Sequence, residues 1–509
     1  MSGKKVQESS VLNLAEYRDK VLGCWLGKNI GGTLGAPLEG KQDFFEVTGY
    51  LQDLDGKPAP NDDLDLQLVW LDAVENHGVY NLNPGVMGEC WVNHIIAGWN
   101  EYGVCRANIL NGFYPPLSGA LNNERWYRSN GAWIRSEIWA CLFPGSPDEA
   151  ARFAVLDASC DHCGDGVYAE IFTAVLESAA FFESDLRKLI ELGLSRIPSD
   201  SRVAGSVRLA CRLFDEGKSL REARDEIVRA NADLGWFQAP GNLGFTVLGL
   251  LYGGGDFGKT LCYAVNCGDD TDCTAATAGS ILGIMYGAKN IPEQWIAPIG
   301  RTIQTVAINR FELPVPGTID ELTDRVVNEA LRAAQENPLL VQFSETESSV
   351  LTAADAAALA TPQALEIDQW AQEFNFPWGT FTVTGEEWPL LESGVARRLK
   401  VEISHTTYVN EVVSIKPLLP EGWSATPAGV VFTPSRRTFV ASAELEITPG
   451  EIDDALIYIP FEIRLAGRAN PFMTAVPFQQ RGAVSGNNMS RLCRARSRQL
   501  RRHQARCCR

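Results

Sequence analysis

The hydrophobic pattern of this chain changes character near residue 376, and that change constrains the fold more than any other feature. Before it, apolar residues recur at helical spacing, as at Leu64, Leu68 and Leu71. After it, short β-rich runs alternate with turn-rich segments. We therefore expect a multidomain protein in which a helical domain is followed by a small all-β sandwich.

The domain division follows from this pattern and from the length of 509 residues, which is too long for one compact core. We expect a helical domain over 12–315, a helical connector over 316–375, a β-sandwich over 376–480 and a disordered arginine-rich tail over 481–509. The connector is predicted to contain two helices, Thr318–Gln335 and Leu365–Phe374. The strands of the sandwich are predicted at Gly379–Val383, Arg398–Ile403, Val430–Phe432, Phe439–Ile447 and Leu456–Arg464.

The end of the chain has an unusual composition, because residues Arg491–Arg509 include eight arginines and no acidic residue. The segment has no hydrophobic pattern, and we expect it to be disordered. An arm for nucleic acid or a membrane surface is one interpretation. An unstructured tail or a reading-frame artefact is the favoured alternative.

Charge and apolar content limit the partners of the folded domains. The formal net charge is −18, which argues against a nucleic-acid-binding surface on them. No stretch approaches the roughly 20 apolar residues of a membrane span, and the N-terminus lacks the apolar core of a signal peptide.

The 13 cysteines are scattered along the chain. Cys160 and Cys163 are interpreted as ordinary thiols, because no second pair at zinc spacing accompanies them. We expect a cytoplasmic protein without membrane contact, whose oligomeric state the sequence leaves open.

The first acidic constellation comprises Asn61, Asp62, Asp63 and Asp65, at the start of an amphipathic helix predicted to run to about Asn76. Asn61 is a good N-cap, and acidic residues in a first turn complement the helix dipole. One cap and one acid would suffice for that purpose, whereas three acids in four positions repel one another. Because cations would relieve this repulsion, the segment is a candidate metal site as well as a capped helix start.

A second group of carboxylates, Asp269, Asp270 and Asp272, is followed by Cys273 and enters a helix predicted over 275–287. A capped helix with surplus surface acids is the structural alternative. An EF-hand is excluded, because the glycine and glutamate that its loop requires are missing. Hard cations such as Mg²⁺ prefer oxygen ligands. Two acidic helix starts in one helical domain therefore favour a dinuclear site, which could clamp a substrate and activate water.

Three further motifs carry less weight. Residues Gly253–Thr260 fit the pattern GxxxxGK[ST], but the surroundings are helical and a phosphate-binding loop needs a preceding strand, so we interpret them as a glycine-rich turn. His162, one of five histidines, is by itself more often a packed residue than a catalytic one. The sequence has no G-x-S-x-G elbow, and no Ser-His-Asp triad is proposed.

Taken together in this order, the motifs resemble the ADP-ribosylglycohydrolase family over roughly residues 15–310. The string Gly23–Glu39 resembles the family's glycine-spaced first helix, which ends in Gly-Ala-Pro-x-Glu. Asn61–Asp63 stands where the family carries Ser/Thr-Asp-Asp, and Asp270–Cys273 stands where it carries Asp-Thr-Asp-Thr/Ser. Three shorter matches, to an Asn-Gly loop, a Ser-x-x-His segment and a closing stretch, are Ser129–Ala132, Ser159–His162 and Ile291–Trp295.

The resemblance implies an all-α orthogonal bundle with two Mg²⁺ ions, or sometimes Mn²⁺, at the bottom of a cleft. It implies that Glu39 lies on a loop covering the metals. By position, the metal ligands would be Asp62, Asp63, Asp270 and Asp272. The residues lining the ribose or diphosphate pocket would be Asn130, Gly131 and His162.

The sequence departs from the family pattern at four positions. Asn61 replaces a hydroxyl ligand, although its amide oxygen could still coordinate a metal. Cys273 places a soft sulfur where a hard oxygen is expected, so that Thr274 or a water would have to compensate if sulfur does not bind. Gly32 replaces a common aspartate, and Lys28 adds a charge in the same helix. These changes put the usual substrate in doubt more than the metal site.

The resemblance implies a metal-dependent hydrolase that cleaves an N- or O-glycosidic bond to a ribose, in ADP-ribosyl conjugates or a related riboside. Glu39 and Asp63 are the candidates for proton transfer, and the sequence does not assign acid and base separately. The alternative is a non-catalytic protein that binds ribose or ADP-ribose, with Asn61 and Cys273 marking a degenerate site. Metal-dependent turnover distinguishes the two, and the expected partner in both cases is a small molecule or an ADP-ribosylated substrate.

Overall fold

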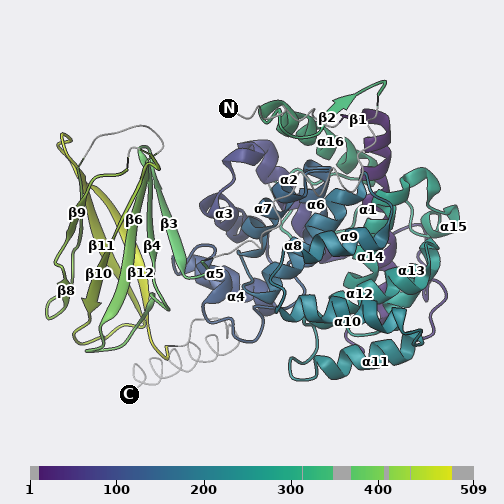
Figure 1. Ribbon diagram of the computed structural model, residues 1–509, viewed down its shortest axis with the longest axis horizontal. Helices are drawn as coiled ribbons and strands as arrows, with labels where there is room; N and C mark the ends of the chain where they lie inside the picture. The colour runs from purple at the N-terminus through teal and green to yellow at the C-terminus, as the bar shows by residue number, and fades with distance from the viewer. Residues whose placement is uncertain (1–10, 312, 348–367, 406–411, 436, 484–509) are drawn as a thin grey trace, which may run out of the picture. The chain divides into compact units, whose positions relative to one another are not determined.

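The computed structural model describes residues 11–311, 313–347, 368–405, 412–435 and 437–483. The chain forms two compact units, one of residues 1–97 with 125–367 and one of residues 98–124 with 368–509. We call them the helical unit and the β unit (Figure 1). The predicted fold class, a helical domain followed by a β domain, is confirmed. Most of the predicted disordered tail and the first ten residues lie outside the described residues.

In the residues that the structure describes, the helical unit consists of helices joined by turns and longer loops, with one small parallel pairing of β1 (Val11–Asn13) and β2 (Gln342–Ser344). Its α-helices are α1 (Leu14–Gly35), α2 (Asp62–His77), α3 (Pro84–His94), α6 (Glu137–Leu142), α7 (Pro147–Ala158), α8 (Asp165–Ala180), α9 (Leu186–Leu194), α10 (Arg202–Asp215), α11 (Leu220–Ala230), α12 (Ala239–Gly253), α13 (Phe257–Asn266), α14 (Thr271–Tyr286), α15 (Glu293–Ile296) and α16 (Ile319–Glu336). Its 3-10 turns are η1 (Ala36–Leu38), η2 (Val79–Asn81), η3 (Trp133–Arg135) and η4 (Ala288–Asn290). No helix in the described part of the chain is both long and apolar enough to cross a membrane.

Helices α1 and α14 pack backbone against backbone at the centre of the helical unit. Every fourth residue of α1 from Gly23 to Gly35 is a glycine. A Cβ atom on Gly27 would lie 2.0 Å from the carbonyl oxygen of Gly279, and one on Gly35 would lie 2.2 Å from that of Thr271. The helices are therefore antiparallel, and the end of α1 meets the start of α14. This contact brings the loop after α1 beside the loop that precedes α14.

Two local predictions about helix boundaries are confirmed. Helix α2 spans Asp62–His77, and the side chain of Asn61 caps it by accepting a hydrogen bond from the backbone N–H of Asp63 at 2.8 Å. Helix α12 ends at Gly253 and α13 begins at Phe257, so the glycine-rich motif between them is a turn between helices. A phosphate-binding loop would need a strand at this point.

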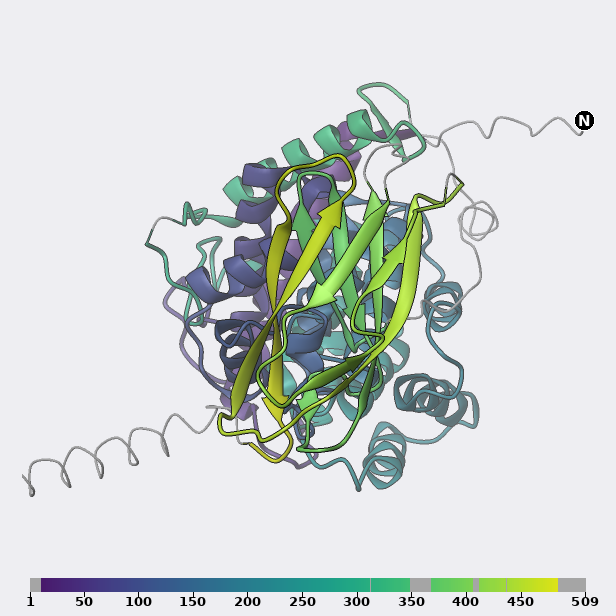
Figure 2. The same cartoon turned by 90° about the vertical axis from the view of Figure 1, so that its left-hand side faces the viewer.

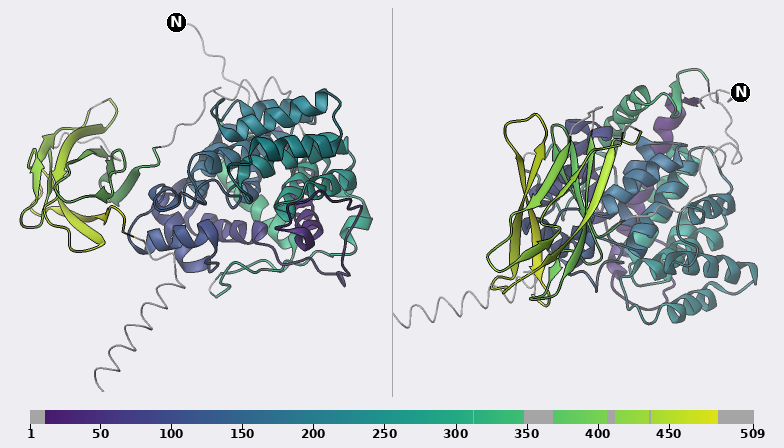
Figure 3. Two further views of the ribbon diagram at one scale, coloured as in Figure 1. Left: turned by 90° about the horizontal axis from the view of Figure 1, so that it is seen from below. Right: turned by 60° about the vertical axis from the view of Figure 1, so that its left-hand side comes forward.

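Within its described residues, the β unit contains two five-stranded sheets, ordered β3-β4-β6-β10-β8 and β5-β12-β11-β7-β9. The long strands lie side by side in Figure 2, and Figure 3 shows the two sheets as separate layers. The strands are β3 (Ala371–Phe376), β4 (Gly379–Thr384), β5 (Leu390–Leu391), β6 (Arg397–His405), β7 (Val413–Pro417), β8 (Ser424–Thr426), β9 (Val430–Phe432), β10 (Val440–Thr448), β11 (Leu456–Leu465) and β12 (Phe472–Gln480). Residues alternate between buried and solvent-facing along β4 and β6, as expected for a sheet with one buried face.

A segment from the first quarter of the chain completes the β unit. Helices α4 (Asn100–Leu110) and α5 (Leu117–Ala120) belong to this unit. Phe113, Leu117 and Leu121 are buried in the same apolar cluster as the strands. The hydroxyl of Tyr458 donates to the carbonyl of Asn111 at 3.0 Å. The β unit is thus built from two parts of the chain that are separated by more than two hundred residues.

One predicted helix, Leu365–Phe374, is wrong over its described part. Residues Ala371–Phe376 form strand β3, which pairs antiparallel with β4. The sequence Ala-Gln-Glu-Phe-Asn-Phe is short, and its Phe374 and Phe376 point to the same face. The tight connection at 377–378 brings β4 back alongside it, so tertiary pairing determines the conformation. The other connector helix, predicted at Thr318–Gln335, corresponds to α16.

Candidate functional site

The two acidic helix starts meet in the helical unit. At these helix starts, two groups of side chains have potential ligand atoms that all lie within 4.8 Å of one another. The first is Asp63, Asp272 and Cys273, and the second is Glu39, Asp270 and Asp272. Because Asp272 belongs to both groups, the geometry resembles two adjacent cation positions that share one carboxylate.

The alternative of surplus surface acids does not fit the start of α14. Asp270 and Asp272 are 4% and 5% exposed. The carboxylate of Asp270 accepts a hydrogen bond from Nδ2 of Asn130 at 2.6 Å. Oδ1 of Asp272 is buried and has no hydrogen-bond partner among the described residues. Such an atom is costly unless a cation or a proton satisfies it.

Burial and mutual repulsion shift the protonation of these groups. Burial, followed by the negative charges of Asp270 and Asp63, raises the pKa of Asp272 well above its ordinary value. Burial also raises the pKa of Asp63 and Asp270. Cations at these positions would favour the ionised carboxylates and so reverse the shifts. The oxygen-rich donor set and the unsatisfied buried oxygen of Asp272 therefore fit divalent cations.

A buried lysine lies behind the cluster. Nζ of Lys28 is 2.7 Å from Oε1 of Glu137 and 3.5 Å from Oδ2 of Asp63, and all three side chains are at most 1% exposed. Burial lowers the pKa of Lys28, but the carboxylates of Glu137 and Asp63 outweigh it and raise the pKa overall. Gln67 donates to Oε2 of Glu137 at 2.9 Å. Lys28 therefore supplies a fixed positive charge to the inner side of the cluster.

Glu39 approaches the cluster from the solvent side. It follows η1, and its loop is fixed by backbone hydrogen bonds from Gly40 to the carbonyl of Asp269 and from Asp269 to the carbonyl of Lys41. Glu39 is the exposed member of its group. Burial of its carboxyl, followed by repulsion from Asp270 and Asp62, raises the pKa of Glu39 to about 7. A carboxyl with this pKa can both accept and donate a proton near neutral pH.

The Asn130–Gly131 loop is held by a network of buried charges. The guanidinium of Arg135 donates to the carbonyl of Gly131 and pairs with Asp161 at 2.6 Å. Asp161 in turn lies 2.8 Å from Nδ1 of His162. Nε2 of His162 lies 3.1 Å from the Ser129 hydroxyl, and His162 is 1% exposed. In this structure His162 supports the loop from within.

Asn61 and Asp62 occupy the remaining predicted ligand positions, at the start of α2. Oδ1 of Asn61 is already engaged in capping. A Cβ atom on Gly32 would lie 2.3 Å from Nδ2 of Asn61, so the glycine at this departure from the family pattern makes room for the asparagine. Asp62 is partly exposed, and its negative charge contributes to the raised pKa of both Glu39 and Asp63. Asp62 therefore lies near the cluster, outside the two groups that approach most closely.

Comparison with known proteins identifies the family of the chain. The family model described as ADP-ribosylglycohydrolase matches residues 13–364. The chain belongs to the ADP-ribosylglycohydrolase family. It is an enzyme of the glycosidic-bond hydrolase type that the family name describes.

Two curated relatives are named ADP-ribosylarginine hydrolase Tri1. The protein of Serratia proteamaculans (strain 568) is 31% identical over 291 residues, covering 55% of this chain and 75% of the relative. The protein of Pseudomonas putida (strain GB-1) is 22% identical over 313 residues, covering 58% and 78%. A solved structure titled "ADP-ribosylglycohydrolase-related protein complex" aligns with 62% of this chain and 99% of its own, with a TM-score of 0.40 and 21% identity.

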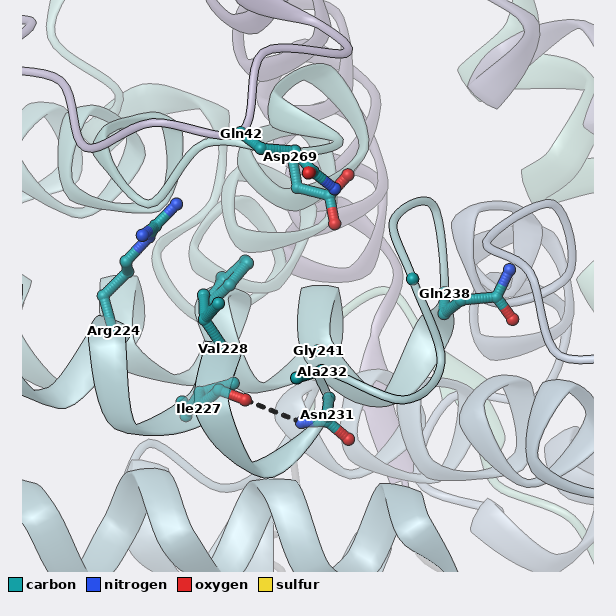
Figure 4. A pocket seen from close by; sticks show the side chains of 11 residues that line it. Gln42, Arg224, Ile227, Val228, Asn231, Ala232, Gln238, Gly241 and Asp269 are labelled. Atoms are coloured by element: carbon teal, nitrogen blue, oxygen red, sulfur yellow. Dashed lines mark hydrogen bonds between the residues drawn. The ribbon is translucent and has the colours of Figure 1, made fainter.

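A cavity of about 250 Å³ adjoins the acidic loop of this ADP-ribosylglycohydrolase (Figure 4). Asp269, the residue before Asp270, forms part of its wall opposite helix α11. Ile227 and Val228 supply apolar surface, and Arg224 adds a guanidinium whose Nε donates to the carbonyl of Cys267 at 2.9 Å. The cavity therefore presents a mixed apolar and polar surface directly beside the loop that carries the candidate ligands.

Sequence reasoning missed the residues that position the cluster. Asn242 donates to Asp269 at 3.2 Å and accepts from the backbone N–H of Asp270 at 3.1 Å. This holds the loop where Asp269 adopts a positive φ of 67°. Glu137 and Arg135 were likewise not singled out. The available signal was a few polar or charged residues within otherwise apolar segments, which is common and therefore uninformative on its own.

Proposed function

We propose that this ADP-ribosylglycohydrolase hydrolyses the N- or O-glycosidic bond between the ribose of an ADP-ribosyl group and its acceptor, using two divalent cations. The observation that carries the proposal is the convergence of two acidic helix starts on Asp272, in a member of this family. Mg²⁺ is the expected ion and Mn²⁺ the alternative, because carboxylate oxygens dominate the donor set.

In this proposal the cations are held by Asp63, Asp270 and Asp272, with Asp62 and Glu39 at the rim. The capping amide of Asn61 orients α2 and has a second lone pair that could face a cation. When bound, the ions supply positive charge that orients the ribose hydroxyls and lowers the pKa of a nearby water. Asp270 is aimed by Asn130, and Asp63 is held between Lys28 and Cys273.

Glu39 is the better candidate for proton transfer. Its exposure places the carboxyl where a substrate can reach it, whereas the other members of its group are buried. Asp63 is 1% exposed and faces a lysine, so we assign it to the metal site rather than to acid–base work. Glu39 would take a proton from the attacking water, or return one to the leaving group.

The loop at Asn130 and Gly131 is proposed to receive the sugar. Both ends of the Asn130 amide are engaged, with Nδ2 bonded to Asp270 and Oδ1 accepting from Trp133 at 3.1 Å. Asn130 therefore acts as a positioning residue, and the carbonyl of Gly131 is itself held by the guanidinium of Arg135. His162 contributes through Ser129, because its own ring is buried.

ADP-ribosyl-arginine is the first substrate to test, since two relatives carry the name ADP-ribosylarginine hydrolase. The panel should add ADP-ribosyl-serine, O-acetyl-ADP-ribose and simple nucleosides, with release of ADP-ribose or ribose followed by mass spectrometry. We expect turnover with Mg²⁺, and loss of turnover with EDTA and in Asp270→Ala/Asp272→Ala. The control is Asp225→Asn, an acid with a 47% exposed side chain on α11.

The outcomes separate an enzyme from a binder. Product that requires both the cation and the two aspartates supports the proposal. If thermal stabilisation by ADP-ribose occurs without product from any member of the panel, the chain is a ribose-binding protein and the catalytic proposal fails.

A further inference from the structure

We propose that the two cation positions differ in chemistry, and that Cys273 makes the Asp63 position a sulfur-containing site that selects a thiophilic divalent cation, such as Zn²⁺ or Co²⁺, over Mg²⁺. The second position, formed by Glu39, Asp270 and Asp272, has only oxygen donors and suits Mg²⁺ or Mn²⁺. This inference rests on the proposed function, and it replaces the expectation of Mg²⁺ for one of the two ions.

The geometry places the sulfur among the ligands. Cys273 is in the first turn of α14, directly after the shared Asp272, and is 5% exposed. Its Sγ lies 3.3 Å from Oδ1 of Asp63, and a carboxylate oxygen of Asp272 completes a group within 4.8 Å. At ordinary Zn–S and Zn–O bond lengths, two ligands of one tetrahedral ion lie about 3.6 Å apart. The sulfur and the Asp63 oxygen are therefore already close to the separation that one ion requires.

The surroundings of Cys273 differ from those of a packing cysteine. A buried cysteine usually behaves as a small hydrophobic residue among apolar neighbours. Cys273 instead lies among the carboxylates of Asp270, Asp272 and Asp63, and its S–H is a weak donor to Oδ1 of Asp63. Cys267, in comparison, is fully buried, and its Sγ lies 3.3 Å from the carbonyl of Tyr263 in its own helical turn.

A second observation points to a missing partner at the same place. Oδ1 of Asp272 is buried and unsatisfied within the described structure, although Asp272 is the residue that both positions share. A cation bound by Asp63, Asp272 and Cys273 would satisfy it. Binding exchanges the thiol proton for the cation, and the proton passes to the buffer without any oxidation or reduction.

The chemical consequence follows from ligand softness. Mg²⁺ requires oxygen donors in near-octahedral geometry, and a thiolate offers it little. Zn²⁺ and Co²⁺ accept a mixture of sulfur and carboxylate donors. Replacing Cys273 by serine restores an oxygen with little change in volume, and it should therefore return this position to the hard cations.

The experiment is a spectroscopic titration of the full-length, chelator-treated protein with Co²⁺. Thiolate coordination to Co²⁺ gives a sulfur-to-metal charge-transfer band in the near ultraviolet, which carboxylate ligands do not produce. We expect this band in the unaltered protein and in Cys267→Ser, and its loss in Cys273→Ser. Calorimetric titrations should show the affinity ratio of Zn²⁺ to Mg²⁺ falling by about tenfold or more in Cys273→Ser.

The experiment distinguishes a failure of this inference from a failure of the proposed function. Co²⁺ bound without the band, no binding of Co²⁺ at all, or an unchanged Zn²⁺ to Mg²⁺ ratio in Cys273→Ser overturns the inference even where Mg²⁺-dependent turnover is intact. A band without turnover for any substrate would instead reject the catalytic proposal. Thermal melting of Cys273→Ser and Cys267→Ser confirms that both variants are folded before they are compared.

Discussion

At the scale of single residues, the candidate site is a balance of buried charges. Asp63, Asp270 and Asp272 bring negative charge into the helical unit, and Lys28 is the positive charge that lies beside them. A buried ion pair contributes little net stability when complete, but removal of one partner leaves the other unpaired in a low-dielectric interior. The cluster is therefore expected to be sensitive to any change in its charge.

Substitution of Lys28 should test this balance. We expect Lys28→Met to lower the free energy of unfolding by about 3 kcal/mol or more, because Glu137 would be left buried without its ammonium partner. Lys28→Met/Glu137→Gln should recover part of the loss. Arg301→Met, which breaks an exposed pair with Asp320, should cost under about 1 kcal/mol. Chemical denaturation measures all three, and equal losses for the buried and exposed pairs would contradict the prediction.

The stability of the metal-free protein should fall as pH rises through the acidic and neutral range. Burial raises the pKa of Asp65 and of Asp269 from 3.8 to about 7. Between pH 3.8 and about pH 7 the folded state therefore binds more protons than the unfolded state. The free energy of unfolding falls as the pH increases through this range and levels off above about pH 7. Melting with EDTA at intervals from roughly pH 5 to pH 8 measures this dependence.

Two comparisons make the pH prediction specific. Asp65→Asn should flatten the dependence, because the amide does not titrate. Divalent cations should stabilise the protein more at high pH than at low pH, since they bind the ionised carboxylates. A melting temperature that rises between pH 5 and pH 8 in EDTA would be inconsistent with the raised pKa values.

At the scale of secondary-structure elements, the contact between α1 and α14 determines where the acidic residues lie. The glycines of α1 allow the two backbones to touch, and the hydroxyl of Thr271 donates to the carbonyl of Gly35 at 2.8 Å. The end of α1 leads to Glu39, and the start of α14 carries Asp270 and Asp272. A change in the distance between α1 and α14 would therefore move these acidic residues relative to one another.

Gly27→Ala should disturb both stability and cation binding. Its Cβ would lie 2.0 Å from the carbonyl oxygen of Gly279, so the helices would have to separate, at a cost of about 2–4 kcal/mol. The affinity for divalent cations should fall as well. Gly205→Ala on α10 is the control, because no described heavy atom lies within 4 Å of its added Cβ and alanine favours the helix. Denaturation and calorimetry measure the two effects.

At the scale of the whole molecule, the β unit is built from two parts of the chain that are far apart in sequence. Residues 98–124 interrupt the helical unit in sequence and contribute Phe113, Leu117 and Leu121 to the core of the β unit. A side-chain bond links Gln372 to the carbonyl of Gly112 at 2.9 Å. The sandwich is therefore not expected to reach its full stability without this segment.

Truncation of one buried side chain should reveal this dependence. Phe113→Ala should destabilise the β unit by about 3–5 kcal/mol, because the fully buried ring leaves a cavity. Hydrogen exchange should accelerate in β11 and β12 and stay unchanged in α14. Leu110→Ala, at a position 62% exposed, is the control and should have almost no effect. Unaltered exchange in the strands of Phe113→Ala would show that the segment contributes nothing to the unit.

The sequence alone determined the local features of this protein. The spacing of apolar residues predicted the helical character of the first unit and half of the strands of the β unit, namely β4, β6, β9, β10 and β11. The capping residue Asn61 and the acids after it marked α2 correctly, because these signals act over a few residues. The tertiary structure decided the rest. It converted part of Leu365–Phe374 into β3, joined residues 98–124 to the β unit, and placed Lys28 against Glu137, which is 109 residues away. Contacts between distant segments depend on packing in three dimensions, and no periodicity along the chain records them.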